Sequence, residues 1–366
     1  MYKYHSSFDQ ITENQLRERD KMFFRTVFVV VLLIQYGQTT SCWMKNRRKH
    51  YQRNHILPAP IEISSMITKY YQYQPLSKHG IYSYSPSKDS LVLAVRACND
   101  AHVALLEKDT DDAKKLYEIV IGGWGNTRSC LRTGKQTKCL ANHYGKVLHC
   151  DEVRYFWVSW NKGTIKVGKG KVVGTDEILS YTDPDPIKIR YFAVSGGFGA
   201  SADFYFCKNE KDSHAPVIIY TPSKYEYKTL GSHRLASHGR FNGFNFYVQA
   251  CNDATIALLS GADDYKPLYE LVLGGWKNTK SCFRDKKQGP CLDEHLEKDI
   301  VSCHKFLPFW VSWKEIKGKL IIKVGKGTNV KYGKIMEYVD ADPIYITNLA
   351  VSGWNKKVTF IFCKQK

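Results

Sequence analysis

Most of the chain is one block that is written twice. Residues 63–210 and 211–366 share an ordered set of short motifs, although much of the sequence between the motifs differs. A repeat of this length is a whole domain, because solenoid units are only about 20 to 50 residues long. The recurring motifs are CNDA at 98–101 and 251–254, GGW at 122–124 and 274–276, FWVSW at 156–160 and 309–313, VGKG at 167–170 and 324–327, and AVSG at 193–196 and 350–353.

The length of 366 residues is that of about two ordinary domains, each large enough to build its own core. The repeat therefore predicts four segments. These are a polar N-terminus with a signal peptide at 1–41, a basic linker at 42–62, and two domains at 63–210 and 211–366.

The N-terminal segment predicts the compartment. Arg25 precedes the apolar run Val27–Ile34, and the small residues Thr39, Thr40 and Ser41 follow it. This order is typical of a secretory signal peptide, and its apolar run is shorter than the ~20 residues of a membrane span. We expect a secreted protein without a stable membrane span, started at Met1 or at Met22. The alternative is an uncleaved signal anchor that leaves residues 1–21 in the cytoplasm.

The formal net charge of +19 is spread over the chain, with one dense basic cluster in the linker. Such a charge favours anionic glycans or anionic lipid surfaces as extracellular partners, and no motif indicates a specific nucleic acid. The alternative is a generally basic surface with no specific anion site. The cluster consists of Lys45, Arg47, Arg48, Lys49 and Arg53.

Ten of the eleven cysteines divide into five per repeat, which in an exported chain indicates disulfides. Strand alternation puts Cys98 and Cys207 on one polar face, so we expect a Cys98–Cys207 bond and a Cys251–Cys363 bond in the copy. We further expect Cys139–Cys150 and Cys291–Cys303 bonds. Cys130 and Cys282 are then left over, either free or paired with each other or with another chain.

The same cysteines also allow a metal site. Cys130, Cys139, His143 and Cys150 recur in the second copy as Cys282, Cys291, His295 and Cys303, and sulfur with imidazole is a shell that zinc prefers. The set lacks closely spaced C-x2-C pairs, and the signal segment favours oxidised cysteines. The prediction is therefore disulfides and no metal.

Short runs rich in Val, Ile, Tyr, Phe and Trp, separated by Gly, Pro or Asn-Asp, predict a nearly all-β chain. No window has the pattern of an amphipathic helix with caps. Each repeat is thus predicted to be an antiparallel, jelly-roll-like β-sandwich. Asn99-Asp100 is predicted to form a hairpin turn, since short polar side chains tolerate positive φ.

The repeated motifs resemble the farnesoic acid O-methyltransferase domain family. The resemblance is carried by CNDAHVAL at 98–105, YEIVIGGWGNTRS at 117–129, FWVSW at 156–160 and IKVG at 165–168, and it covers most of both repeats. It implies a compact β-sandwich and, through the family name, methyl transfer from S-adenosylmethionine to farnesoic acid. The family's usual pattern has other residues at Cys98, Cys130 and Cys139, so this chain is similar to a disulfide-bonded, exported version.

The residues themselves do not favour that chemistry. S-adenosylmethionine enzymes typically use a strand, a glycine-rich turn and a helix. The nearest strings, at 168–170 and 195–199, precede no helical pattern and indicate hairpins. We therefore expect no bound cofactor and no catalytic residues. The favoured function is a secreted tandem binding protein for a glycan, lipid or extracellular protein, and the alternative is the methyltransferase.

Shared aromatic and amide side chains are the candidate binding residues. Tryptophan rings offer flat faces for sugars or an isoprenoid chain, and the alternative for each ring is core packing. Trp157 and Trp160 must face opposite sides of a strand, so one is expected in the core and one exposed. For the asparagines, the alternative to ligand binding is capping of a loop. The candidates are Trp124, Asn126 and Trp160, with Trp276, Asn278 and Trp313 in the copy.

Overall fold

The computed structural model describes residues 56–57, 60–64, 72–79, 81, 89–109, 115–207, 215–221, 224–231, 242–262, 264, 267–354 and 356–363. The expected signal peptide, the basic cluster at 45–53 and Cys42 lie outside these residues. In the part of the chain that is described, no helix has both the length and the apolar character that a membrane crossing needs.

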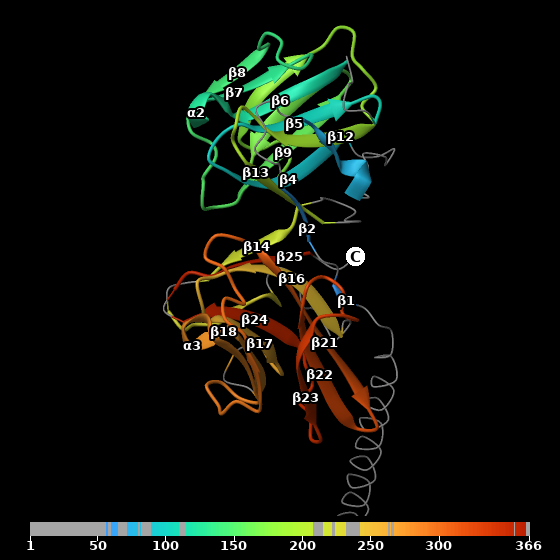
Figure 1. Cartoon of the computed structure of the whole chain (residues 1–366). Coiled ribbons are helices and arrows are strands. Elements are labelled where there is room, and N and C mark those ends of the chain that lie inside the picture. Colours follow the sequence, from blue (N-terminus) through green and yellow to red (C-terminus); the bar gives the residue numbers. More distant parts are fainter. Residues whose placement is uncertain are drawn as a thin grey trace, which may run out of the picture. The chain divides into compact units, whose positions relative to one another are not determined.

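The first repeat folds into two facing antiparallel sheets, drawn in blue to yellow-green in Figure 1. Their strand orders are β11-β10-β9-β4-β13-β2 and β3-β12-β5-β6-β7-β8. The elements are β2 (Ile61–Ser64), β3 (Gln74–Pro75), the 3-10 helix η2 (Leu76–His79), β4 (Ser90–Ala97), β5 (Ala101–Leu106), β6 (Leu116–Gly122), α2 (Gly123–Asn126), β7 (Arg128–Arg132), β8 (Ala141–Tyr144), β9 (Arg154–Asn161), β10 (Thr164–Lys169), β11 (Glu177–Thr182), β12 (Tyr191–Gly196) and β13 (Ala202–Phe206).

The second repeat has the same two-layer architecture. One sheet has the order β14-β25-β16-β21-β22-β23, with β1 (Ile56–Leu57) pairing parallel to β16, and the other has the order β15-β24-β17-β18-β19-β20. Strands β1 and β2 both begin within the segment expected as a linker. The other elements are β14 (Val217–Tyr220), β15 (Lys228–Thr229), β16 (Gly243–Gln249), β17 (Ala254–Leu259), β18 (Leu268–Gly274), α3 (Gly275–Asn278), β19 (Lys280–Arg284), β20 (Asp293–Leu296), β21 (Leu307–Ile316), β22 (Lys319–Lys326), β23 (Lys334–Asp340), β24 (Asn348–Gly353) and β25 (Thr359–Phe362).

The expected fold class is confirmed: both repeats are all-β sandwiches. Alternating side chains of each strand fill the space between the sheets, as β17 illustrates, where Ile256 and Leu258 belong to the core of the second sandwich. Thr255 directly precedes Ile256 in the strand. Its side chain therefore points to the outer face of the sheet, where it lines a cavity. Outer-face residues of this sheet therefore line a cavity.

The prediction of a hairpin at Asn99-Asp100 is wrong. Strands β4 and β5, which flank this turn, belong to different sheets, so the turn crosses from one layer of the sandwich to the other. The expected backbone conformation is present, since Asp100 and Asp253 both have φ of 51°. The local sequence predicted a turn, but it did not specify which strands the turn joins.

The predicted Cys98–Cys207 and Cys251–Cys363 bonds are wrong, because the structure joins Cys98 to Cys150 and Cys251 to Cys303. Strands β4 and β13 run antiparallel with Ala97 opposite Ala202, so Cys98 and Cys207 lie at opposite ends of the pair. Cys207 instead pairs with Cys363 and links the two repeats.

The predicted Cys139–Cys150 and Cys291–Cys303 bonds are also wrong. Cys130 bonds to Cys139 and Cys282 bonds to Cys291, so the two cysteines expected to be left over are paired within their own domains. Each bond closes a short loop of sequence separation 9 beside β7 or β19. All six cysteines of the zinc alternative are thus in disulfides and are not thiolate ligands.

Candidate functional site

A cavity of about 390 Å³ lies on the outer face of the sheet that contains β17, β18 and β19 in the second sandwich. Its strand residues point outward because their neighbours Ile256, Leu271 and Phe283 face the core. Loop residues at both ends of the strands build the walls. The cavity is lined by Tyr225, Asn252, Asp253, Thr255, Val272, Trp276, Lys277, Arg284, Gln288 and Trp354.

A left-handed turn after β18 carries Trp276 at the rim of the cavity. Trp276, Lys277 and Asn278 have φ of 50°, 59° and 61°. Side chains other than glycine adopt this conformation at a cost of roughly 1–2 kcal/mol per residue, and such strain is concentrated at functional sites. The turn leaves the Trp276 ring 44% exposed.

The side chain of Asn278 holds this turn in place. Its Nδ2 donates to the carbonyl oxygen of Val301 at 2.7 Å, and its Oδ1 accepts from the amide of Val301 at 3.2 Å. Thr279 Oγ1 adds a bond to the carbonyl oxygen of Trp276 at 2.7 Å. These hydrogen bonds thus hold the backbone of the turn that carries Trp276.

The buried carboxylate of Glu270 forms hydrogen bonds with several residues that line the cavity. Its Oε2 accepts from Arg284 Nη1 at 2.6 Å and from the Gln288 amide at 3.0 Å. Its Oε1 accepts from the hydroxyl groups of Tyr227, at 2.7 Å, and Tyr225. Glu270 is completely buried, so this carboxylate orients three cavity-lining residues without lining the cavity itself.

Two buried polar atoms of the lining have no hydrogen-bond partner among the residues that the structure describes. They are Oδ1 of Asn252, an acceptor, and Nε of Arg284, a donor. Leaving such a group unsatisfied costs about 1–3 kcal/mol. Both atoms belong to residues that line the cavity.

Aromatic rings form the apolar part of the lining. The Tyr225 and Trp354 rings are in contact, with centroids 4.8 Å apart, and Trp354 is 44% exposed. Trp276 lies under the ammonium group of Lys280, at 4.1 Å, and the guanidinium group of Arg284, at 5.6 Å. Three large rings and several planar polar groups therefore meet in one cavity.

Charges within the lining are balanced. Arg284 is paired with Glu270, and Asp253 lines the same cavity as Lys277. Burial raises the pKa of Asp253 above its ordinary value of 3.8, while Lys356 and Arg284 act to lower it. Of the charged lining residues, Arg284 is thus neutralised by Glu270, and Lys277 and Asp253 have opposite charges.

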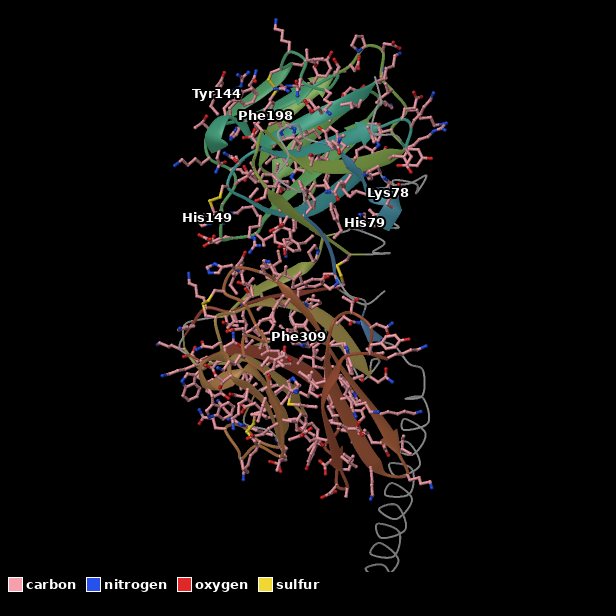
Figure 2. The ribbon with its side chains drawn as sticks, in the orientation of Figure 1. Lys78, His79, Tyr144, His149, Phe198 and Phe309 are labelled. Carbon is pink, nitrogen blue, oxygen red and sulfur yellow. A yellow bond between two sulfur atoms is a disulfide. The ribbon has the colours of Figure 1, made fainter. Side chains whose placement is uncertain are left out.

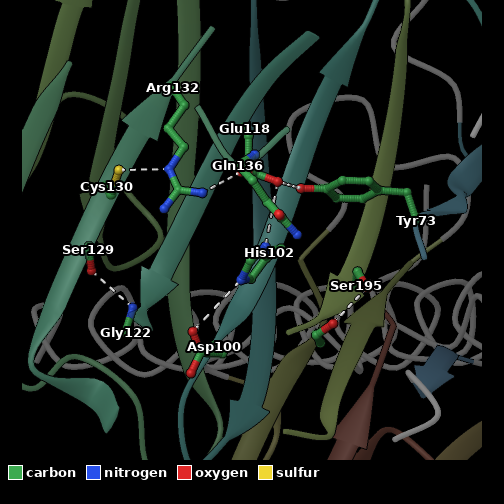
Figure 3. Close-up of polar contacts among 11 residues, drawn as sticks. Tyr73, Asp100, His102, Glu118, Gly122, Ser129, Cys130, Arg132, Gln136 and Ser195 are labelled. Atoms are coloured by element: carbon green, nitrogen blue, oxygen red, sulfur yellow. Dashed lines mark hydrogen bonds and ion pairs between the residues drawn. The ribbon is translucent and has the colours of Figure 1, made fainter. Parts of the chain in front are cut away.

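The first sandwich repeats the buried carboxylate but not the cavity lining. Glu118 accepts from Tyr73, Arg132 and the Gln136 amide at 2.8, 2.9 and 2.9 Å, and Figure 3 shows this cluster together with His102. Pairing with β6 and β12 puts His102 at the position that Thr255 has in the copy.

His102 fills the space above its sheet. Its ring is completely buried, and a Cβ added at Gly197 would lie 2.5 Å from its Nε2. Gly197 corresponds to Trp354 by its place after the AVSG motif, so Thr255 and Trp354 of the second sandwich are both replaced in the first. The two sandwiches thus share the buried pairs Glu118–Arg132 and Glu270–Arg284, but the residues above these pairs differ.

His102 lies between two carboxylates. Its Nε2 is 3.9 Å from Asp100 Oδ1 and its Nδ1 is 3.8 Å from Glu118 Oε1. Burial acts to lower the pKa of His102, but Asp100 and Glu118 outweigh it and raise this pKa above 6.5. Burial acts to raise the pKa of Glu118, but interactions with His102, the Gln136 amide and Tyr73 lower it to about 2.

The structure separates the candidate binding residues into two groups. Trp124 and Trp276 are exposed by 45% and 44% on equivalent turns, and their role in binding stays a prediction. Trp160 packs partly buried against the core, and Trp313 is buried. The side-chain amide of Asn126, like that of Asn278, forms hydrogen bonds with a loop, here with Leu148 and Val147.

The expectation that one of Trp157 and Trp160 lies in the core and the other is exposed is wrong. Trp157 and Trp310 are completely buried although they lie on the outer face of their sheet. Each ring packs over a glycine of the neighbouring strand, Gly168 or Gly325, and its Nε1 donates to a loop carbonyl group. Residues of the following hairpin cover this face.

Sequence reasoning missed several cavity residues. A signal was present, because Glu118 and Glu270 are lone acidic residues inside otherwise apolar strands, and an arginine follows each after 14 residues. A buried carboxylate needs such a partner. The missed lining residues are Tyr225, Asn252, Asp253, Thr255, Val272, Lys277, Arg284, Gln288 and Trp354, and the buried Glu270 was missed with them.

Comparison with known proteins identifies the class. The profile described as farnesoic acid O-methyl transferase matches residues 68–210 and 221–366. The chain therefore belongs to this family and contains two tandem copies of its domain.

One curated relative is Uncharacterized protein 5 of Haliotis asinina, 37% identical over 113 residues. That match covers 31% of this chain and 64% of the relative, so the chain spans less than two thirds of the relative's length.

Two solved structures have similar parts. A prokaryotic β-1,3-1,4-glucanase (lichenase) from a mouse hindgut metagenome has 10% identity and a TM-score of 0.25, over 32% of this chain and 63% of that one. A native glycosidic hydrolase has 9% identity and a TM-score of 0.25, over 42% and 97%.

Proposed function

We propose that the protein is a secreted binding protein and that its second sandwich holds a neutral saccharide in the cavity of about 390 Å³. The observation that carries the proposal is the joint lining by three aromatic rings and by two buried polar atoms that lack partners among the described residues. The volume lies in the range of small-ligand sites, about 300–1,000 Å³.

A saccharide has the two kinds of surface that this lining requires. One face of a pyranose ring is made of C–H groups, which pack on Trp276, Trp354 or Tyr225. Its hydroxyl groups both donate and accept, so they satisfy Asn252 Oδ1 and Arg284 Nε. An isoprenoid chain would leave both atoms unsatisfied, at about 1–3 kcal/mol each.

Charge balance favours a neutral ligand. Arg284 already forms an ion pair with Glu270, and Lys277 and Asp253, which have opposite charges, line the same cavity. A charged sugar would lose hydration without a net gain of ion pairing.

The disulfides support the proposed secretion. Five bonds join ten cysteines, and stable disulfides persist in oxidising compartments. The signal-like segment at 22–41 points to the same location.

The family description favours methyl transfer as a second candidate. We favour binding because S-adenosylmethionine sites typically use the N-terminus of a helix after a glycine-rich turn. The α-helical segments within the described ranges, Gly123–Asn126 and Gly275–Asn278, are single turns with left-handed residues.

The experiment is titration calorimetry of the full chain with a panel of neutral mono- and oligosaccharides. We expect at least one saccharide to bind the wild type, and Asn252→Ala and Trp354→Ala to weaken that binding at least tenfold. Absence of binding across the panel contradicts the proposal. Methyl ester formed from S-adenosylmethionine and farnesoic acid would support the second candidate instead.

A further inference from the structure

The first sandwich has a basic segment without a single carboxylate in its sequence. Residues 119–150 contain five Lys or Arg residues and no Asp or Glu. The corresponding residues 271–303 of the copy contain six basic and five acidic residues. The five basic residues of the first copy are Arg128, Arg132, Lys135, Lys138 and Lys146.

Arg128 lies close to two exposed aromatic rings on this segment. Its guanidinium carbon lies 4.5 Å from the Trp124 ring centroid and 5.7 Å from that of Tyr144. Trp124 and Tyr144 are 45% and 73% exposed, and Figure 2 labels Tyr144 at the edge of the first sandwich. The rings orient the guanidinium group without neutralising its charge.

A neutral amide provides the polar contact of Arg128. Its Nε donates to Asn142 Oδ1 at 2.8 Å, and its Nη2 donates to the same oxygen. Both Nη1 donors have no partner among the described residues, and no carboxylate there forms an ion pair with Arg128. A guanidinium group fixed in this way is pre-organised for a sulfate or carboxylate group.

The copy shows the neutralised counterpart of this arrangement. Lys280 has the position of Arg128 and bonds to Glu294 at 2.7 Å. Strand pairing puts Glu294 opposite Cys282 as it puts Asn142 opposite Cys130, so the carboxylate occupies the place of the amide. Leu296 likewise occupies the place of Tyr144.

Two further cations extend the surface along the same hairpin. Lys138 precedes β8 and Lys146 follows it, and both are exposed. Neither forms an ion pair with a carboxylate in the described part of the chain. We name the five residues Trp124, Arg128, Lys138, Tyr144 and Lys146 the hairpin surface.

We infer that the hairpin surface binds an acidic polysaccharide, with a sulfate or carboxylate group on Arg128 and sugar rings beside Trp124 and Tyr144. This function is separate from the neutral cavity of the second sandwich and does not depend on it. A polysaccharide fits better than nucleic acid because five disulfides indicate an oxidising compartment. The repeated negative charges of a polysaccharide match cations that are spread along a hairpin.

The test measures binding of the full chain to immobilised heparin, as a sulfated polysaccharide, in about 0.15 M salt, where weak long-range attraction is screened. Three variants each lower the net charge by one unit: Arg128→Gln, Asn142→Glu and the matched control Lys280→Gln. We expect Arg128→Gln to weaken binding about fivefold, as the loss of one ion pair does. Asn142→Glu should weaken it at least as much, because it supplies the internal carboxylate that the copy already has.

The following outcomes would contradict the inference. Absence of heparin binding by the wild type overturns it. Equal weakening by Lys280→Gln shows that general charge, not the hairpin surface, holds the polymer, and unchanged binding by Asn142→Glu also contradicts it. Tighter binding to single-stranded DNA than to heparin in the same salt would assign the surface to nucleic acid. Binding of uncharged dextran that Arg128→Gln weakens as much as heparin binding would exclude recognition of the anionic groups.

Discussion

Arg284 donates a hydrogen bond from Nη1 to Oε2 of Glu270 at 2.6 Å, and the carboxylate that accepts it is completely buried. Arg132 and Glu118 form the same bond at 2.9 Å in the first sandwich. Removal of the acid from such a pair leaves a desolvated cation. We predict that Glu270→Ala lowers the free energy of unfolding by about 3–5 kcal/mol, measured by urea denaturation.

The control for this prediction is Glu294→Gln, which breaks the partly exposed pair with Lys280. That variant should lose less than about 1 kcal/mol. Equal losses for the two variants would show that Glu270 has no special structural role.

The pKa shifts of Glu118 and His102 predict a loss of stability at acidic pH and a second loss at higher pH. The pKa of Glu118 is lowered from 4.5 to about 2, so its stabilisation is complete above pH 4.5 and is lost as the pH falls towards 2. The pKa of His102 is raised above 6.5, so its stabilisation is complete below pH 6.5 and is lost as the pH rises through the raised value.

Thermal unfolding across this pH range checks both signs. Glu118→Gln should flatten the acid limb, and His102→Thr, which introduces the residue of the second sandwich, should flatten the upper limb. If His102→Thr instead steepens the loss of stability at high pH, the direction assigned to the His102 pKa is incorrect.

The left-handed turn predicts a stabilising substitution. Lys277 has φ of 59°, and the first sandwich has Gly125 at this place with φ of 65°. Glycine adopts this conformation without steric cost, so Lys277→Gly should raise the free energy of unfolding by about 1 kcal/mol. Lys277→Ala retains the Cβ atom and should give no such gain. Similar gains for both variants would exclude backbone strain as the cause.

Close packing of tryptophan on glycine predicts a large loss. A Cβ at Gly168 would lie 2.3 Å from the Trp157 ring, whereas one at Gly170, with φ of 92°, meets nothing within 4 Å. Gly168→Ala should therefore destabilise the chain by about 1–3 kcal/mol or more through overpacking. Gly170→Ala should cost only about 1 kcal/mol through its backbone conformation. Chemical denaturation of the two variants compares the effects, and a smaller loss for Gly168→Ala contradicts the packing.

The fold could be predicted from local patterns, and the connections could not. Apolar and polar residues alternate in 244–249, and the apolar Phe244, Phe246 and Val248 do lie in the core. It did not show that Asn99-Asp100 joins different sheets, nor that Cys98 and Cys207 lie at opposite ends of paired strands. Both depend on which strands pair, a non-local property that periodicity does not encode.

The candidate site was only partly predictable for a similar reason. Trp276 was found because it recurs in a motif, and its turn does present it to the cavity. Thr255, Arg284 and Trp354 come from separate segments and meet only through the order of β17, β19 and β24 in the sheet. Thr255 and Trp354 also differ between the copies, so a search for shared residues could not find them.

The most direct test of the central claim compares Trp276→Ala with Trp124→Ala by titration calorimetry with the neutral saccharide that the wild type binds. The two rings lie on equivalent left-handed turns and are 44% and 45% exposed, so the variants differ mainly in whether the ring lines the cavity. We predict at least a tenfold loss of affinity for Trp276→Ala and wild-type affinity for Trp124→Ala. Equal loss in both variants, or loss in Trp124→Ala alone, would contradict a saccharide site in the second sandwich.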